Sequence, residues 1–132
     1  MYADYSYNKI MKVTPNATGS LYRLPLSNIR RPIALDYDVV EDRVYWTDSS
    51  KISRSFLNGS SQEIIIDTNS YSRYGLAVDS VGRNLYWTDY GSGAGMVEVS
   101  KLDGSRRMAL VTHNLNQPRD IILDVYKGLV CG

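Results

Sequence analysis

The chain has 132 residues, a normal size for one domain or part of one, and long enough to bury a core if it closes on itself. Its 15 basic and 14 acidic residues are scattered rather than clustered, which argues against a nucleic-acid-binding stripe or a basic membrane-binding face. Eleven tyrosines accompany one phenylalanine. Because tyrosine suits positions with a buried ring and a hydroxyl that reaches water or a partner, we expect strand faces at a rim or between sheets.

Local signals along the chain are those of strands and turns. Short runs rich in Val, Ile, Leu and Tyr are broken every eight to twelve residues or so by Gly, Asn, Asp or Ser, and no stretch keeps a helical apolar period. The dipeptides Asn58-Gly59 and Asp103-Gly104 tolerate the positive φ of tight hairpins. In chain order we expect strands over residues 9–14, 21–26, 33–36, 43–48, 51–57, 62–66, 76–79, 84–89, 96–102, 107–112, 121–124 and 128–131.

Two long segments repeat each other. Aligning residues 31–66 with 74–111 brings "VYWTDSS" beside "LYWTDYG", and it pairs Trp46 with Trp87, the only tryptophans of the chain, 41 positions apart. A third copy begins at "DIILDVYKGLV", and the second half of a copy precedes the first complete one in "NKIMKVTPNATGSLYRLPL". The alignment also pairs Ala34 with Ala77, Leu35 with Val78, Asp36 with Asp79, and Asn58-Gly59 with Asp103-Gly104.

A four-stranded antiparallel repeat of about 40 residues is typical of a β-propeller blade. A solenoid would need one parallel strand per turn, which these hairpins do not supply. In a propeller, an aromatic pair repeated once per blade fills the wedge between neighbouring sheets, and the Thr-Asp after it can satisfy backbone donors at the blade end. We therefore favour packing over ligand stacking for both tryptophans.

The paired "YWTD", with "IALD" and "LAVD" before it and "LDGS" after it, resembles the YWTD (class B) repeats of the low-density lipoprotein receptor family over nearly the whole chain. The resemblance implies an all-β fold, part of a six-bladed propeller, with about two complete four-stranded antiparallel blades plus two partial ones. It implies that the aspartates of the motif tie neighbouring blades together. The positions of the structural motif are Tyr45, Trp46, Thr47, Asp48, Tyr86, Trp87, Thr88 and Asp89.

The same resemblance divides the chain into four parts. These are a partial first blade of two strands over 1–30, YWTD blades over 31–73 and 74–117, and the truncated start of a further blade over 118–132. In the third copy, Cys131 and Gly132 stand where Tyr and Trp of the motif belong. We therefore expect a fragment, a truncated gene model or a half-propeller that associates with another copy, in that order.

In this family such propellers belong to the ectodomains of single-pass receptors and to some matrix proteins, usually beside EGF-like modules. The resemblance implies a non-enzymatic, extracellular binding module whose partner is a protein ligand: a lipoprotein, a Wnt-type protein or a matrix component as in nidogen. It implies no nucleic-acid partner, and membrane contact only through an anchor outside the chain. The candidate loop positions, each more simply read as a solvated loop, are Arg30, Arg31, Asp38, Glu41, Asp42, Tyr71 to Tyr74, Tyr90 and Arg119.

The sequence contains few residues in patterns typical of catalysis or metal binding, and we assign no catalytic residue, metal ligand or cofactor. The single histidine, His113, allows neither a His-based metal site nor a triad, and Cys131 has no histidine nearby in sequence. Asp36, Asp79 and Asp124 recur at one strand end and could form an acidic ring for calcium. We favour a repeated turn cap over that ring. If the ring did bind calcium, the chain would belong to a calcium-dependent hydrolase-like propeller, which is the alternative function.

Two Asn-x-Ser/Thr triplets begin at Asn16 and Asn58, both in predicted turns. Such triplets arise by chance, but beside an extracellular family they become candidate glycan sites on hairpin tips. The chain shows no signal segment after Met1 and no apolar run long enough to span a bilayer.

Overall fold

The structure, a computed structural model, describes residues 2–4, 9–13, 21–27, 29, 32–48, 51–67, 73–89 and 96–111. Each strand predicted between residues 9 and 112 is present there, with its ends shifted by a few residues. Strands predicted beyond residue 112 lie outside these ranges. The strands are β1 (Tyr2–Asp4), β2 (Lys9–Val13), β3 (Leu21–Arg23), β4 (Pro32–Asp38), β5 (Arg43–Asp48), β6 (Lys51–Phe56), β7 (Glu63–Asp67), β8 (Arg73–Asp79), β9 (Asn84–Asp89), β10 (Met96–Lys101) and β11 (Met108–Val111).

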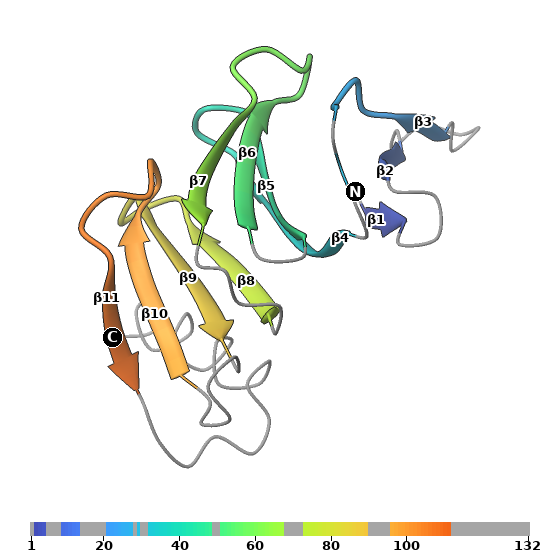
Figure 1. The fold of residues 1–132 in the computed structure, drawn as a ribbon. Helices are drawn as coiled ribbons and strands as arrows, with labels where there is room; N and C mark the ends of the chain where they lie inside the picture. The colour runs from blue at the N-terminus through green and yellow to red at the C-terminus, as the bar shows by residue number, and fades with distance from the viewer. Residues whose placement is uncertain are drawn as a thin grey trace.

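The strands form three antiparallel sheets that follow one another in chain order (Figure 1). One has the order β4-β5-β6-β7, here called blade I, and the next has the order β8-β9-β10-β11, blade II, so the predicted four-stranded meanders are confirmed. Strands β4 and β8, each at an edge of its sheet, pack against each other. This arrangement is that of neighbouring propeller blades, whose first strands line the axis. Within the described ranges no helix is long and apolar enough to cross a membrane.

The N-terminal sheet has three strands, β1-β2-β3, whereas the sequence predicted two strands for this partial blade. The missed strand, β1, pairs Asp4 with Lys9 in the way that β5 pairs Asp48 with Lys51. Asp4 therefore stands at the position of the motif aspartate. The strand escaped prediction because "MYAD" keeps only the last letter of "YWTD".

The aligned positions of the two first strands need a correction. At the hairpin, β4 pairs Asp38 with Arg43, and β8 pairs Asp79 with Asn84. The two hairpin loops are thus equally long, so the offset of 41 positions between the tryptophans also applies to the strands before them. Asp38 is the equivalent of Asp79, and the predicted pairing of Asp36 with Asp79 is wrong by two positions.

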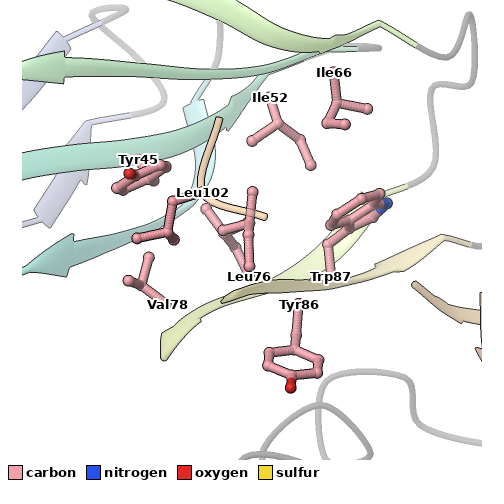
Figure 2. Close-up of a cluster of buried hydrophobic side chains, with 9 residues drawn as sticks. Tyr45, Ile52, Ile66, Leu76, Val78, Tyr86, Trp87 and Leu102 are labelled. Carbon is pink, nitrogen blue, oxygen red and sulfur yellow. The ribbon is translucent and has the colours of Figure 1, made fainter. Parts of the chain in front are cut away.

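The core lies between the sheets rather than within one of them. Trp46 packs against the N-terminal sheet, in a cluster completed by Ile10, Leu24, Leu26, Ile29 and Val44. Trp87 packs against blade I, and Tyr45 of blade I enters the same interface from the other side (Figure 2). The remaining buried members of this second cluster are Ile52, Ile66, Leu76, Val78, Leu85, Tyr86 and Leu102.

Candidate functional site: the blade interface and its two loop ends

The YWTD motif occupies equivalent strands, β5 and β9, and its side chains are buried wherever they are described. Tyr45, Trp46 and Thr47 are at most 1% exposed and Asp48 is 9% exposed. Tyr86, Trp87 and Thr88 are buried in the same way, while the side chain of Asp89 lies outside the described residues. Because neighbouring residues of a strand point to opposite faces, each tryptophan packs on the preceding sheet and Tyr45 on the following one. These side chains hold sheets together and present no surface to a ligand.

Polar groups of the motif are used inside the blades. The Thr47 hydroxyl oxygen accepts a hydrogen bond from the Ala34 amide at 3.1 Å, which confirms for this threonine the predicted role of satisfying a backbone donor. The indole of Trp87 donates to the buried carboxylate of Glu98 at 3.1 Å, and Arg107 donates to the same carboxylate at 2.8 Å. Sequence reasoning missed Glu98. The predicted strands 84–89 and 96–102 form an antiparallel hairpin, and their register, which places Glu98 directly opposite Trp87, was the signal that could have found it.

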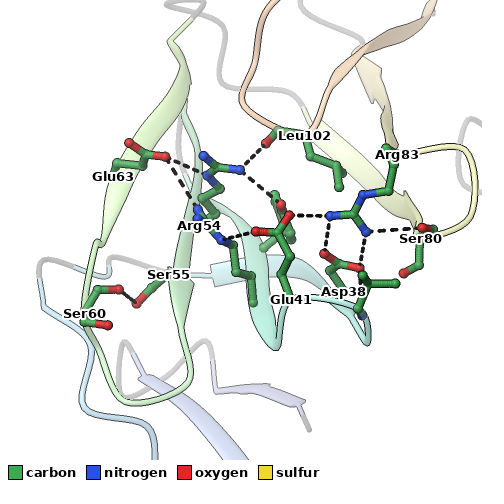
Figure 3. Close-up of polar contacts among 12 residues, drawn as sticks. Asp38, Glu41, Arg54, Ser55, Ser60, Glu63, Ser80, Arg83 and Leu102 are labelled. Carbon is green, nitrogen blue, oxygen red and sulfur yellow. Dashed lines mark hydrogen bonds and ion pairs between the residues drawn. The ribbon is translucent and has the colours of Figure 1, made fainter.

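An arginine of blade II reaches back to blade I at the hairpins. Arg83 donates to the two carboxylate oxygens of Asp38 at 2.8 and 2.9 Å and to the Ser80 carbonyl at 3.2 Å (Figure 3). It also forms an ion pair with Glu41. Burial alone would raise the pKa of Asp38, but the hydrogen bonds from Arg83, from Ser80 and from the Val40 amide together hold it below the ordinary 3.8. Asp38 is fully buried, so the prediction of a solvated loop carboxylate is wrong there.

A second arginine crosses the same boundary from blade I. Arg54 donates to Glu63 at 2.6 Å and to the Leu102 carbonyl of blade II at 3.1 Å. Arg43 joins the two halves, with its guanidinium nitrogens 3.5 Å from a Glu41 oxygen and 3.9 Å from a Glu63 oxygen. We call this set the charge network; its members are Asp38, Glu41, Arg43, Arg54, Glu63 and Arg83. Figure 3 labels all of them except Arg43.

Two aspartates proposed for an acidic ring do different things. Asp36 accepts a hydrogen bond from the Val78 amide of blade II at 2.8 Å, so it links the blades, and burial raises its pKa despite this bond. Asp79 accepts from the Val81 and Gly82 amides of its own turn at 3.2 and 2.9 Å, which is the predicted cap. Within the described ranges, no group of three or more His, Cys, Asp or Glu residues could hold a metal ion. Asp124 lies outside those ranges.

The antiparallel order separates the loops into two ends. Loops 39–42, 57–62, 80–83 and 102–107 lie at one end, here called the hairpin end. Strands β5, β7 and β9 all finish at the opposite end, here called the linker end.

The candidate loop positions are divided between these ends. Asp38, Glu41 and Asp42 belong to the hairpin end, where the first two bind Arg83 and the third accepts a hydrogen bond from the Tyr37 hydroxyl. Arg73 and Tyr74, at the start of β8, belong to the linker end, and only their backbone is described. The other predicted positions outside the described residues are Asn16, Arg30, Arg31, Tyr71, Ser72, Tyr90, His113, Arg119 and Cys131.

Comparisons with known proteins agree with this architecture. Residues 83–125 match the family model described as "Low-density lipoprotein receptor repeat class B". The chain is 44% identical over 106 residues to low-density lipoprotein receptor-related protein 5 of Mus musculus, covering 77% of this chain and 6% of that protein. It is 40% identical over 88 residues to low-density lipoprotein receptor-related protein 8 of Homo sapiens, covering 62% of this chain and 9% of that protein. The chain thus spans a small part of each relative.

Solved structures share the fold. A crystal structure of a nidogen/laminin complex superposes with a TM-score of 0.78 at 27% identity, over 86% of this chain and 43% of that one. The tricorn protease superposes with a TM-score of 0.54 at 15% identity, over 74% of this chain and 10% of that one, a likeness of fold alone. The repeat match, the receptor relatives and the shared propeller fold agree with the buried YWTD motif: this chain is built from class B (YWTD) repeats of the low-density lipoprotein receptor family and forms part of a β-propeller.

Proposed function

We propose that the chain is part of an extracellular, six-bladed propeller that binds a protein ligand in a lipoprotein-receptor-like protein. One observation carries this proposal: the buried motif side chains and the charge network are used within and between the blades. What remains for a partner is the surface of the loops. This is the function of a binding module and not of an enzyme, in keeping with relatives that are receptor-related proteins.

We place the ligand at the linker end. The segments that join the strands there carry Tyr71, Tyr90 and Arg31 in the sequence, and Tyr74 stands at the start of β8. Tyrosine and arginine are enriched among residues that dominate binding energy. At the hairpin end, by contrast, the carboxylates of Asp38 and Glu41 are already paired with Arg83. EGF-like modules would flank the propeller in the complete protein.

The ligand class follows from similarity. The receptor relatives are named after the low-density lipoprotein receptor, which favours a lipoprotein, and the family resemblance adds a Wnt-type protein. The nidogen/laminin structure, which is 27% identical to this chain over the superposed part, favours a matrix protein as second candidate. In either case the ligand is a protein surface or particle, bound through a rim of loops.

The test uses the complete protein that contains this chain, immobilised on a biosensor. Low-density lipoprotein, a Wnt protein and a laminin fragment serve as the three analytes. We expect one of them to bind, and the combined change Tyr71→Ala, Tyr74→Ala and Tyr90→Ala to weaken that binding by about tenfold or more.

The matched control lies at the hairpin end, where Val39, Val40 and Val81 are exposed. Changing these three valines to serine leaves binding within about twofold of the original, since side chains outside an interface contribute little. Loss of binding with the serine variant and not with the alanine variant would move the ligand to the hairpin end. Binding of none of the three analytes would count against a protein-ligand module.

A further inference from the structure

Two hairpin turns at equivalent places in the blades have the same geometry but differ in one chemical group. In blade I, Oδ1 of Asn58 accepts hydrogen bonds from the Ser60 amide at 2.9 Å and the Ser60 hydroxyl at 2.7 Å. In blade II, Oδ1 of Asp103 accepts from the Ser105 amide at 2.9 Å and the Ser105 hydroxyl at 2.6 Å. The turn therefore needs one side-chain oxygen at its first position and does not need the amide nitrogen of asparagine.

The amide nitrogen of Asn58 has no structural task among the described residues. The side chain is exposed, and no described acceptor takes a hydrogen bond from Nδ2. The rest of the hairpin is held firmly: Gln62 accepts a hydrogen bond from the Ser27 amide at 2.9 Å, and a Cβ on Gly59 would lie 2.2 Å from the Pro25 carbonyl oxygen. The turn thus docks on the preceding segment while Asn58 faces solvent.

We propose that Nδ2 of Asn58 carries an N-linked glycan. The triplet Asn58-Gly59-Ser60 has the acceptor pattern, and its third residue already contacts the acceptor amide through the Ser60 hydroxyl. The donor is a lipid-linked oligosaccharide pyrophosphate. A bond forms between Nδ2 and C1 of the first sugar, the bond between C1 and the phosphate oxygen breaks, and Nδ2 gives up one proton.

The folded turn can keep this modification without losing a hydrogen bond. Both turn bonds use Oδ1, so a sugar on Nδ2 leaves them in place. The turn belongs to the hairpin end, opposite the proposed ligand face, so the glycan would shield the charge-network side and leave the linker end free. The inference rests on the proposed extracellular location, because the donor is met in the secretory pathway.

The test is expression of the complete protein that contains this chain, behind a heterologous secretory leader, in mammalian cells. Release of glycans by an amidase in ¹⁸O-water converts a glycosylated asparagine to aspartate with one ¹⁸O atom, which mass spectrometry locates. We expect the label at Asn58 and its loss in Asn58→Asp. That variant keeps the turn, as Asp103 does, so it should be secreted at the original level.

A gain-of-site variant completes the experiment. Asp103→Asn creates the same triplet with Gly104 and Ser105 on the equivalent turn, and we expect it to acquire a second labelled site. If the secreted protein carries no label at Asn58, the inference is wrong. The result is sharpest if Asp103→Asn is labelled, because the equivalent turn is then shown to accept a glycan. Because the leader fixes the route and ligand binding is measured separately, that result would leave the proposed binding function standing.

Discussion

The guanidinium of Arg83 in blade II donates two hydrogen bonds, of 2.8 and 2.9 Å, to the carboxylate of Asp38 in blade I. The Asp38 side chain is fully buried, whereas that of Arg83 is 33% exposed. A buried carboxylate depends on its partner, because burying a charge without one is costly. The stability of the blade interface should therefore depend on this arginine more than on its neighbours at the surface.

Replacing Arg83 by asparagine tests this dependence. Arg83 has a left-handed backbone with a φ of 61°, which asparagine tolerates better than most residues, so the turn should survive. We expect a loss of about 2 kcal/mol in the free energy of unfolding, less than for a fully buried pair because Arg83 is partly exposed. Urea unfolding measures the loss.

The control for this variant is Arg106→Asn. Arg106 is also left-handed, with a φ of 55°, but it is exposed and forms no ion pair with any described residue. Its replacement should change stability by no more than about 0.5 kcal/mol. Equal losses for the two variants would show that the interblade pair contributes nothing.

Acid should weaken the same pair. The pKa of Asp38 is lowered in the folded protein, so its contribution is fully present above the ordinary carboxyl pKa and is lost as the pH falls through the lowered value. The stability difference between the original protein and Arg83→Asn should be largest at about pH 7 and should shrink as the pH falls through the pKa values of Asp38 in the two folded proteins, because burial without the arginine raises that pKa in the variant. Urea unfolding of both proteins across this range checks the sign; a difference that grows on acidification contradicts it.

Replacing Gly104 by alanine should destabilise the protein. Its φ is 89°, and an added Cβ would lie 2.3 Å from the Ile65 carbonyl oxygen of blade I, a backbone atom that cannot move alone. We expect Gly104→Ala to lower the free energy of unfolding by about 3 kcal/mol, from backbone strain and the clash together. Thermal and urea unfolding would both report this loss.

Gly82→Ala is the matched comparison. There the nearest atom to an added Cβ is a carboxylate oxygen of Asp79. This carboxylate can shift by weakening its hydrogen bonds to the Val81 and Gly82 amides, and the backbone is not left-handed. A loss of about 1 kcal/mol is expected. If Gly82→Ala proved the more damaging change, the close approach of Gly104 to blade I would not be limiting.

The two tryptophans should differ in their sensitivity to phenylalanine. Trp87 donates to buried Glu98, whereas the indole nitrogen of Trp46 has no hydrogen-bond partner among the described residues. Trp87→Phe should therefore destabilise by about 1 kcal/mol more than Trp46→Phe, since it removes a hydrogen bond to a buried carboxylate.

A double-mutant cycle isolates that bond. Combining Trp87→Phe with Glu98→Ser should show a coupling of about 1 kcal/mol, because each change removes the same hydrogen bond. Serine is chosen as the replacement because Ser53 faces Trp46 at the equivalent position of blade I. Combining Trp46→Phe with Ser53→Ala should show none. Absence of coupling in the first cycle would mean that Glu98 is held by Arg107 alone.

The strand pattern and the propeller fold were predictable from the sequence because they depend on short-range signals. The repeat of "YWTD", the alternation within strands and the glycine turns at Gly59 and Gly104 are local, and each marks the same element in both blades. The burial of both tryptophans follows from the same repetition. β1 escaped because only Asp4 of its motif remains recognisable.

The sequence by itself determined the architecture of this protein: antiparallel blades joined by buried aromatic residues. Only the tertiary structure decided how the charges are shared, because Asp38 and Arg83 lie 45 positions apart and no local pattern brings them together. It also distinguished Asp36, which bonds to the next blade, from Asp79, which caps its own turn. These contacts depend on how one sheet stacks on another, and stacking sets distances that spacing along the chain does not encode.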